Sequence, residues 1–188
     1  MKQQTLNTLS ETETSLQTSL QTSLRSEVVS SVRVLGDKHL TVGFAESCTG
    51  GLLSSYFTEL PGVSSVFVGS IISYDNKIKQ KFLKVSEETL KTKGAVSFEA
   101  AKQMAEEALK ALEVEVAVSI TGIAGPSGGS ALKPVGTVFI AVAGTENETV
   151  SFEHHFDGER KAIQIQTCYE AVKHLNDYIK NCKKNKKN

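Results

Sequence analysis

The chain has 188 residues, of which 39% are apolar and 22% charged, and its formal net charge is zero. This composition predicts one domain with a well-buried core and excludes a disordered chain. Balanced charge offers no global field for nucleic acid or an anionic membrane surface, and no apolar run approaches the roughly 20 residues that span a bilayer. We therefore expect no nucleic-acid partner and no membrane contact.

The cysteines and the N-terminus both indicate a cytoplasmic protein. Cys48, Cys168 and Cys182 are odd in number and lack C-x-x-C spacing, which argues against a disulfide framework and against a thiolate zinc site. The first residues lack the apolar segment of a signal peptide.

The N-terminal segment carries the imperfect repeat SLQTSLQTSLRS, which places Leu16, Leu20 and Leu24 on one face of a helix. Val28 and Val32 extend this stripe. Two interpretations stay open: a helix docked on its own domain, or a helix that contacts another subunit and makes the protein a homo-oligomer.

From residue 40 onward, apolar runs alternate with helical patterns. We expect strands over residues 40–45, 64–74, 115–121, 135–144 and 149–156, and helices over residues 52–60, 75–83, 98–112 and 158–180. Asp75 or Asn76 is expected to cap the second of these helices and Ser97 the third. The short link between the last two strands predicts a hairpin. The fold class is therefore α/β: a three-layer α/β/α sandwich with a single mixed, mostly parallel central sheet.

The chain divides into three parts in this interpretation. Residues 1–24 form an N-terminal extension, partly helical or disordered, residues 25–180 form the domain, and residues 181–188 form a basic tail. We expect the lysine-rich tail to be a solvated end; contact with nucleic acid or an acidic partner is the alternative.

The segment TVGFAESCTGG (41–51) is the most informative part of the sequence. Ser47 lies where a strand gives way to a helix, so the N–H groups of Cys48, Thr49, Gly50 and Gly51 are expected to be free to bind an anion. Glycine in the first turn of a helix costs about 1 kcal/mol relative to alanine, which suggests a ligand against the backbone. Alternatively, Ser47 or Thr49 only caps the helix and the glycines allow close packing.

A second polar segment, ISYDNKIKQK (72–81), follows the end of the next strand. Tyr74, Asn76 and Lys79 are spaced so that they can face one cleft. A catalytic lysine must be neutral, and we expect two influences to lower its pKa: burial, and the like charges of Lys77 and Lys81 if these side chains lie close to it. The alternative is a set of solvated lysines on a helix face.

A third segment is the glycine-rich loop over residues 122–134. It lacks the Walker pattern, and the chain contains no G-x-G-x-x-G. Backbone N–H groups in such a loop can form an anion cradle, here with Gly122, Ala124, Gly125 and Gly128, to which Lys133 would add charge. The alternative is a surface loop between two strands.

These segments, taken with others, resemble a known family. AESCTGG, Tyr74-x-Asn76-x-x-Lys79, GAVS (94–97), TGIAGP with its following glycines, KPVGTV (133–138) and F-x-G-x-R ending at Arg160 occur in the same order in the C-terminal domain of CinA, the competence/damage-inducible family. The resemblance covers about residues 28–178. Stand-alone members are nicotinamide-nucleotide amidases, whereas the separate N-terminal domain of full-length CinA is not expected in this chain.

The resemblance implies hydrolysis of nicotinamide mononucleotide to nicotinate mononucleotide and ammonia, without a metal or other cofactor. By position, Ser47 is the expected nucleophile, Lys79 the general base, and Tyr74 a partner that orients or relays the proton. The substrate phosphate would be held by the loop over residues 122–129 and by Arg160, whose guanidinium matches phosphate oxygens.

Two alternatives remain open at this point. Cys48 would be the nucleophile if the helix N-terminus lowered its thiol pKa, but His154 and His155 alternate on a strand and neither is paired with it by the sequence. The protein could also be a non-catalytic nucleotide-binding or regulatory module. A scaffold for DNA uptake would need a basic face, which the charge balance does not provide.

Overall fold

The computed structural model describes the backbone of residues 2–184 and the side chains of residues 17–184. Its strands form one five-stranded sheet in the order β2-β1-β3-β4-β5. The strands are β1 (Val42–Glu46), β2 (Phe67–Ile72), β3 (Val116–Gly122), β4 (Thr137–Gly144) and β5 (Val150–His155). The helices are α1 (Lys2–Lys38), α2 (Leu52–Thr58), the short 3₁₀ helix η1 (Val63–Ser65), α3 (Asn76–Leu83), α4 (Glu87–Thr92), α5 (Phe98–Ala111) and α6 (Arg160–Lys180).

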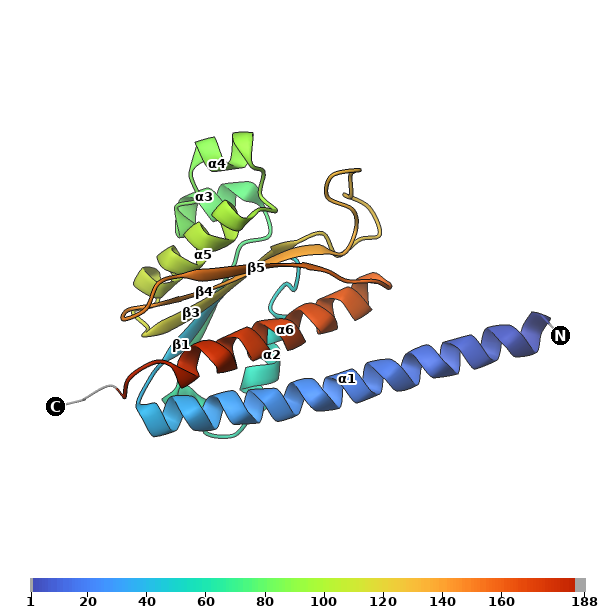
Figure 1. Cartoon of the computed structure of the whole chain (residues 1–188), viewed down its shortest axis with the longest axis horizontal. Helices are drawn as coiled ribbons and strands as arrows, with labels where there is room; N and C mark the ends of the chain where they lie inside the picture. The colour runs from blue at the N-terminus through green and yellow to red at the C-terminus, as the bar shows by residue number, and fades with distance from the viewer. Residues whose placement is uncertain (1, 185–188) are drawn as a thin grey trace.

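The sheet is mixed and has helices on both faces, which confirms the predicted sandwich. β1 pairs in parallel with β2 and β3, whereas β4 is antiparallel to both β3 and β5, so β4 alone runs against the other strands. Helices α3, α4 and α5 cover one face, and α2 and α6 cover the other, with α1 packed along α6 (Figure 1). The predicted hairpin is the β4–β5 pair.

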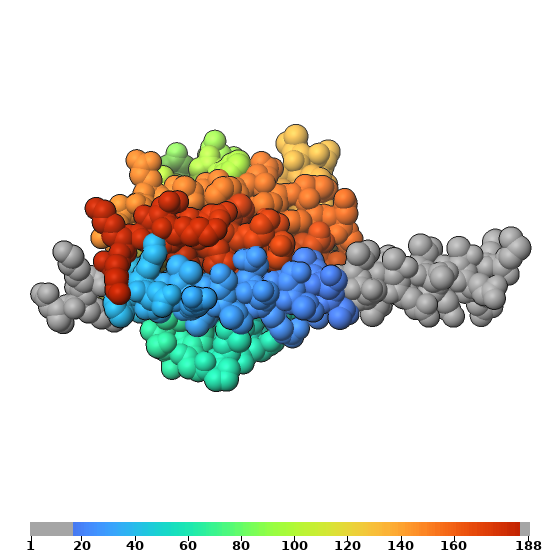
Figure 2. Space-filling model, turned by 60° about the horizontal axis from the view of Figure 1, so that its bottom comes forward, coloured from blue at the N-terminus to red at the C-terminus, as the bar shows by residue number. Residues whose placement is uncertain are grey.

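Helix α1 is docked on its own domain through an apolar face. Leu24, Val28 and Leu35 are fully buried in the main core, and Leu20 and Val32 pack against that core. On the face shown in Figure 2, α1 lies between α6 and the segment that contains α2 and η1. The part of the leucine stripe that the structure describes is thus used within the chain, and it gives no support to a homo-oligomer.

A buried polar contact fixes α1 against α6. Ser31 Oγ donates a hydrogen bond of 2.7 Å to Asn176 Oδ1, and the Asn176 amide donates to the carboxylate of Glu27. These partners satisfy groups whose burial would otherwise be costly. The Leu16 side chain and residues 185–188 of the basic tail lie outside the described residues, and α1 continues without interruption through residue 24.

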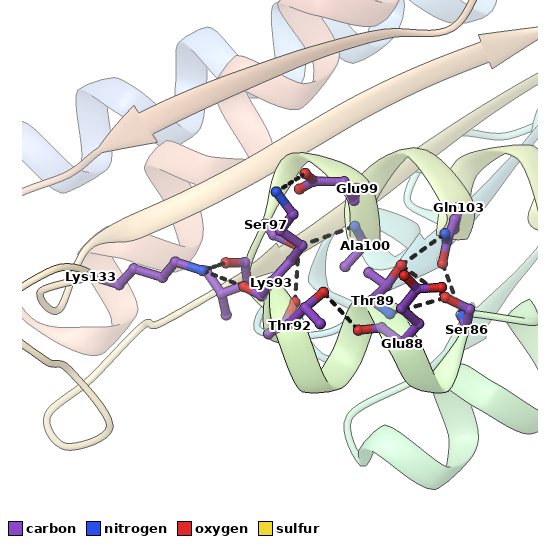
Figure 3. Close-up of polar contacts among 12 residues, drawn as sticks. Ser86, Glu88, Thr89, Thr92, Lys93, Ser97, Glu99, Ala100, Gln103 and Lys133 are labelled. Atoms are coloured by element: carbon purple, nitrogen blue, oxygen red, sulfur yellow. Dashed lines mark hydrogen bonds and ion pairs between the residues drawn. The ribbon is translucent and has the colours of Figure 1, made fainter.

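The predicted helix caps are present, but two helices were not predicted: α4 and the short η1, which replaces the first residues of the strand expected over residues 64–74, so that β2 begins only at Phe67. The Asp75 side chain accepts from the N–H of Lys77, and Ser97 accepts from that of Ala100. Helix α4 has only six residues, too few to show a period, so its sequence gives no clear signal. It is held from outside, because Gln103 on α5 donates to the Thr89 hydroxyl on α4 (Figure 3).

The chain order of the strands determines where a ligand can bind. The chain leaves β1 through α2 toward β2 on one side and returns through α5 to β3 on the other side of β1. Clefts form outside the carboxyl ends of parallel strands at such a switch point.

An aromatic cluster packs α2 against the first two strands. The rings of Phe44 (β1), Phe57 (α2) and Phe67 (β2) pack together, with the Phe44 ring centred 4.8 Å from that of Phe57 and 5.0 Å from that of Phe67.

Within the described part of the chain, no helix combines the length and the apolar character needed to cross a membrane.

Candidate active site

A cavity of about 220 Å³ opens at the carboxyl ends of β1, β2 and β3. It brings together residues from all three segments that the sequence singled out. The lining residues that were predicted are Ser47, Cys48, Tyr74, Asn76, Lys79, Gly122, Ala124, Gly125, Gly128 and Arg160. The cavity is also lined by Ala95, Val96, Thr121, Ile123 and Ser127.

The centre of the cavity is a contact between Lys79 and Ser47. Lys79 Nζ lies 2.8 Å from Ser47 Oγ and also donates to the carbonyl oxygen of Ser73. Helix α3 buries the face that carries Lys79, so this side chain is only 2% exposed. Ser47 follows β1 directly, and its own N–H donates to the carbonyl of Ile120 on β3. Both partners are therefore held by the sheet.

Burial lowers the pKa of Lys79 to about 8, from an ordinary value of 10.5. Cys48 and Asp75 oppose this effect weakly. The lowering of the pKa and its first predicted cause, burial, are confirmed. The second predicted cause, the like charges of the neighbouring lysines, makes no contribution. Lys77 and Lys81 lie two residues away on either side of Lys79 and are exposed, because positions i and i+2 of a helix face different directions.

The turn after Ser47 differs from the prediction in its backbone. Helix α2 begins at Leu52, and Gly50 and Gly51 precede it with φ values of 60° and 99°. Glycine adopts this left-handed conformation without the steric cost paid by other residues. The glycines therefore serve the turn, and the expected penalty within a helical turn does not arise.

The N-terminus of α2 is occupied by a side chain that the sequence analysis missed. The Glu46 carboxylate is fully buried and accepts hydrogen bonds from the N–H groups of Gly51, Leu53 and Ser54 and from the hydroxyls of Thr49 and Ser54. A carboxylate at a helix N-terminus also interacts favourably with the helix dipole. The signal in the sequence was an acidic residue ending a buried strand just before unpaired N–H groups.

Glu46 therefore changes the assignment of the predicted anion donors. Thr49, Gly50 and Gly51 do not line the cavity. The Gly50 N–H donates to the Ser47 carbonyl, the Gly51 N–H donates to Glu46, and Thr49 donates to Glu46 through its hydroxyl. Cys48, next to Ser47, lines the cavity, and within the described residues its N–H has no hydrogen bond to another residue.

The rim of the cavity carries a cationic group. Arg160, the first residue of α6, donates from Nη1 to the Gly125 carbonyl at 2.8 Å and from Nη2 to the Tyr74 hydroxyl at 3.2 Å. Tyr74 is 64% exposed, and among the described residues it has no hydrogen bond to Ser47 or Lys79. In the structure the Tyr74 hydroxyl therefore contacts the Arg160 guanidinium and not the Lys79 amine.

The glycine-rich loop borders the cavity, but its lysine does not. Lys133 Nζ donates to the carbonyl oxygens of Lys93 and Val96, at the junction between α4 and α5 (Figure 3). The expectation that Lys133 adds charge to an anion cradle is therefore wrong. The Lys133 ammonium already has two backbone carbonyl oxygens as hydrogen-bond acceptors and does not line the cavity.

The thiol alternative loses its physical basis. Burial raises the pKa of Cys48 to about 12, which outweighs any effect of the nearby helix N-terminus. His154 contacts His174 on α6, whereas His155 is exposed, so neither histidine reaches the cavity.

Two supporting residues were not found from the sequence. The Ser73 carbonyl holds the Lys79 amine, and the Gln164 amide on α6 donates at 2.8 Å to the Cys48 carbonyl. The Gln164 contact spans 116 residues, and the Ser73 contact is made by a backbone carbonyl, so the type of side chain at neither position distinguishes it in the sequence.

The buried carboxylate generates a stability prediction. Glu46→Gln places an amide NH₂ against groups that are all donors, so we expect the free energy of unfolding in urea to fall by about 1.5–3 kcal/mol. Glu59→Gln is the matched control at the other end of α2, because its ion pair with Arg25 is solvent-exposed and should contribute less than about 1 kcal/mol. Equal effects of the two changes would contradict the assigned role of Glu46.

Comparison with known proteins places the chain in a family. The model of the CinA C-terminal domain matches residues 22–179. A CinA-like protein of Thermotoga sp. (strain RQ2) is 45% identical over 149 residues, and one of Leptospira borgpetersenii (strain L550) is 46% identical over 148 residues. Each match covers 79% of this chain but only 36% and 35% of the relative, so the chain spans about a third of the length of these curated relatives.

The fold is also found in solved structures. The crystal structure of the competence/damage inducible protein CihA from Agrobacterium tumefaciens has a TM-score of 0.82 at 37% identity, and the match covers 85% of this chain and 96% of that one. A CinA superfamily protein from Escherichia coli has a TM-score of 0.77 at 28% identity, covering 81% and 88%. The chain belongs to the CinA C-terminal domain family.

Proposed function

We propose that this protein is an amidohydrolase that converts nicotinamide mononucleotide to nicotinate mononucleotide and ammonia through a Ser/Lys acyl-enzyme. The observation that carries the proposal is the buried 2.8 Å contact between Lys79 Nζ and Ser47 Oγ inside a cavity. A nucleophile and a base within hydrogen-bond distance, with the base held by a third group, is the arrangement that covalent catalysis requires. Here the third group is the Ser73 carbonyl.

In the proposed first step, neutral Lys79 removes the hydroxyl proton of Ser47 as Oγ attacks the amide carbon. The C–N bond then breaks, and the ammonium of Lys79 returns the proton to the departing nitrogen, which leaves as ammonia. Water attacks the resulting ester with Lys79 again as base, which releases the carboxylate and restores the Ser47 hydroxyl. One buried amine serves both steps.

The tetrahedral intermediate needs a donor for its oxyanion. Because Glu46 takes the N–H groups at the start of α2, we assign this role to the free N–H of Cys48. The residue after a nucleophile commonly supplies such a donor. Losing one oxyanion donor typically costs about 2.7–4 kcal/mol of transition-state stabilisation.

The substrate class follows from the charge at the rim and from the family resemblance. Arg160 lies at the N-terminus of α6, where unpaired N–H groups and the helix dipole favour an anion. Its two hydrogen bonds fix the guanidinium at the cavity edge. We propose that Arg160, with the loop over residues 122–128, binds the phosphate, while the nicotinamide amide reaches Ser47.

The identity of the nucleophile is tested by ammonia release from nicotinamide mononucleotide. Ser47→Ala should reduce kcat by at least roughly 10³-fold, because no other group can form the ester. Cys48→Ala should keep a measurable fraction of activity. The opposite result would exclude the serine mechanism, and a wild-type protein that binds the nucleotide without releasing ammonia would show a non-catalytic module.

The state of Lys79 predicts the pH dependence. With a pKa of about 8, roughly a tenth of the amine is neutral at pH 7, so kcat/KM should rise with pH and level off above about pH 8. Lys77→Ala, on the exposed side of α3, should leave this inflection in place, and Lys79→Arg should be inactive since a guanidinium stays protonated. A flat profile between pH 6.5 and 9.5 would contradict Lys79 as the base.

Phosphate binding is tested with two substrates. Arg160→Ala should raise KM for nicotinamide mononucleotide at least roughly tenfold, because a charge-assisted contact is lost, and should change kcat/KM for nicotinamide riboside little. Lys161→Ala removes the neighbouring exposed cation and should affect neither substrate. Equal losses on both substrates would mean that Arg160 holds the loop and does not bind phosphate.

A further inference from the structure

Away from the cavity, three metal-ligating side chains gather between β5 and α6. His154 comes from β5, and Glu170 and His174 come from α6; one ligand atom of each lies within 4.8 Å of those of the other two. We propose that these residues form a binding site for a divalent first-row transition metal ion such as Zn²⁺. This site is independent of the proposed amidase chemistry.

Local structure places the three side chains on facing surfaces. Along β5, His154 shares a face with Phe152 and Phe156, and these residues are partly buried, whereas Glu153 and His155 are exposed. On α6, Glu170 and His174 are four residues apart and so lie on the same side of the helix.

The distances suit a metal ion with imidazole ligands. The two Nε2 atoms of His154 and His174 are 2.8 Å apart. Two nitrogens bound to one tetrahedral Zn²⁺ at about 2.0–2.1 Å would be separated by roughly 3.3 Å, so the two ring nitrogens need to move apart by only about half an ångström. Two histidines and one glutamate leave a further position for water, and this ligand set suits zinc and neighbouring transition metals.

Aromatic neighbours hold both imidazoles in place. The His174 ring is stacked on Phe152, with centroids 3.6 Å apart and planes 1° from parallel, and the His154 ring is stacked on Phe156 at 5.3 Å. Packing that fixes ligand orientation lowers the cost of assembling a metal site.

The two imidazoles already face each other. In the metal-free arrangement their contact is a single hydrogen bond shared between the two Nε2 atoms, so one ring donates and the other accepts.

A metal ion at this site would have to displace the Lys173 ammonium from the Glu170 carboxylate. Lys173 Nζ lies 3.0 Å from Glu170 Oε1, but the lysine side chain is 42% exposed and the pair is a surface contact three residues apart. The Glu170 side chain is only 21% exposed and the ammonium contacts both of its oxygens, but the flexible lysine can turn toward solvent and leave the carboxylate to another cation. A divalent ion held by two imidazoles would replace it at the carboxylate.

The bound ion would fasten an edge strand to the long helix. Among the described strands β5 pairs with β4 alone, so a link from His154 to α6 would give this edge strand a second attachment. Arg160 and His174 are fourteen positions apart on α6, about 21 Å along the axis, so metal binding and the cavity can be tested separately.

The test is calorimetric titration of the metal-free full-length protein with Zn²⁺, together with thermal unfolding. We expect one ion per chain, and a melting temperature about 5–10 °C higher when zinc is present at a hundred times its dissociation constant. Glu170→Gln and His174→Ala should each weaken binding at least tenfold and abolish the shift. His155→Ala, which removes the exposed neighbouring histidine, should leave both unchanged.

The conservative change of the two, Glu170→Gln, separates loss of metal binding from misfolding. Glu170→Gln keeps the shape of the side chain and leaves the stacked rings intact, so its metal-free melting temperature should stay close to that of the wild type. Zinc affinity that is unchanged in Glu170→Gln and His174→Ala, or lost in His155→Ala, would overturn the site. Absence of a stoichiometric heat would overturn it as well.

Discussion

One interaction underlies the whole site: the Lys79 amine is buried against the Ser47 hydroxyl. Lowering the pKa from 10.5 to about 8 means that the fold disfavours the charged amine by roughly 3 kcal/mol. A protein can sustain this cost only if the surrounding structure holds the side chain firmly, and strained or desolvated groups of this kind gather at functional sites. The result is a base that is partly neutral near physiological pH.

The rest of the fold serves to keep that contact in place. β1 ends at the switch point of the sheet and carries Ser47, while α3 starts behind the Asp75 cap and turns Lys79 inward. Glu46 occupies the N-terminus of α2 and so fixes the turn after Ser47. The proposed phosphate subsite lies at the other helix N-terminus at the cavity, that of α6, where the Gly125 carbonyl and the Tyr74 hydroxyl hold the Arg160 guanidinium at the cavity edge.

The sequence predicted those features that leave a local pattern. Alternating strands and helices, the Asp75 and Ser97 caps, and a hydroxyl and a lysine after consecutive strands all followed from residue order. It could not predict contacts made by packing across the chain, such as the Tyr74–Arg160 bond or the pairing of His154 with His174. The role of Glu46 was missed because an acidic residue at a strand end is ordinarily solvated, and here the helix start buries it.

The central claim is tested most directly by the ionisation of Lys79 itself. Titration of ¹³C,¹⁵N-labelled protein by NMR, with the Lys79 side-chain signal assigned by its loss in Lys79→Arg, reports this pKa without substrate. The account predicts a lysine that titrates near pH 8, well apart from the exposed lysines. A Lys79 signal that titrates near 10.5 with the others would contradict it, because the amine would then be charged at working pH and unable to accept the proton of Ser47.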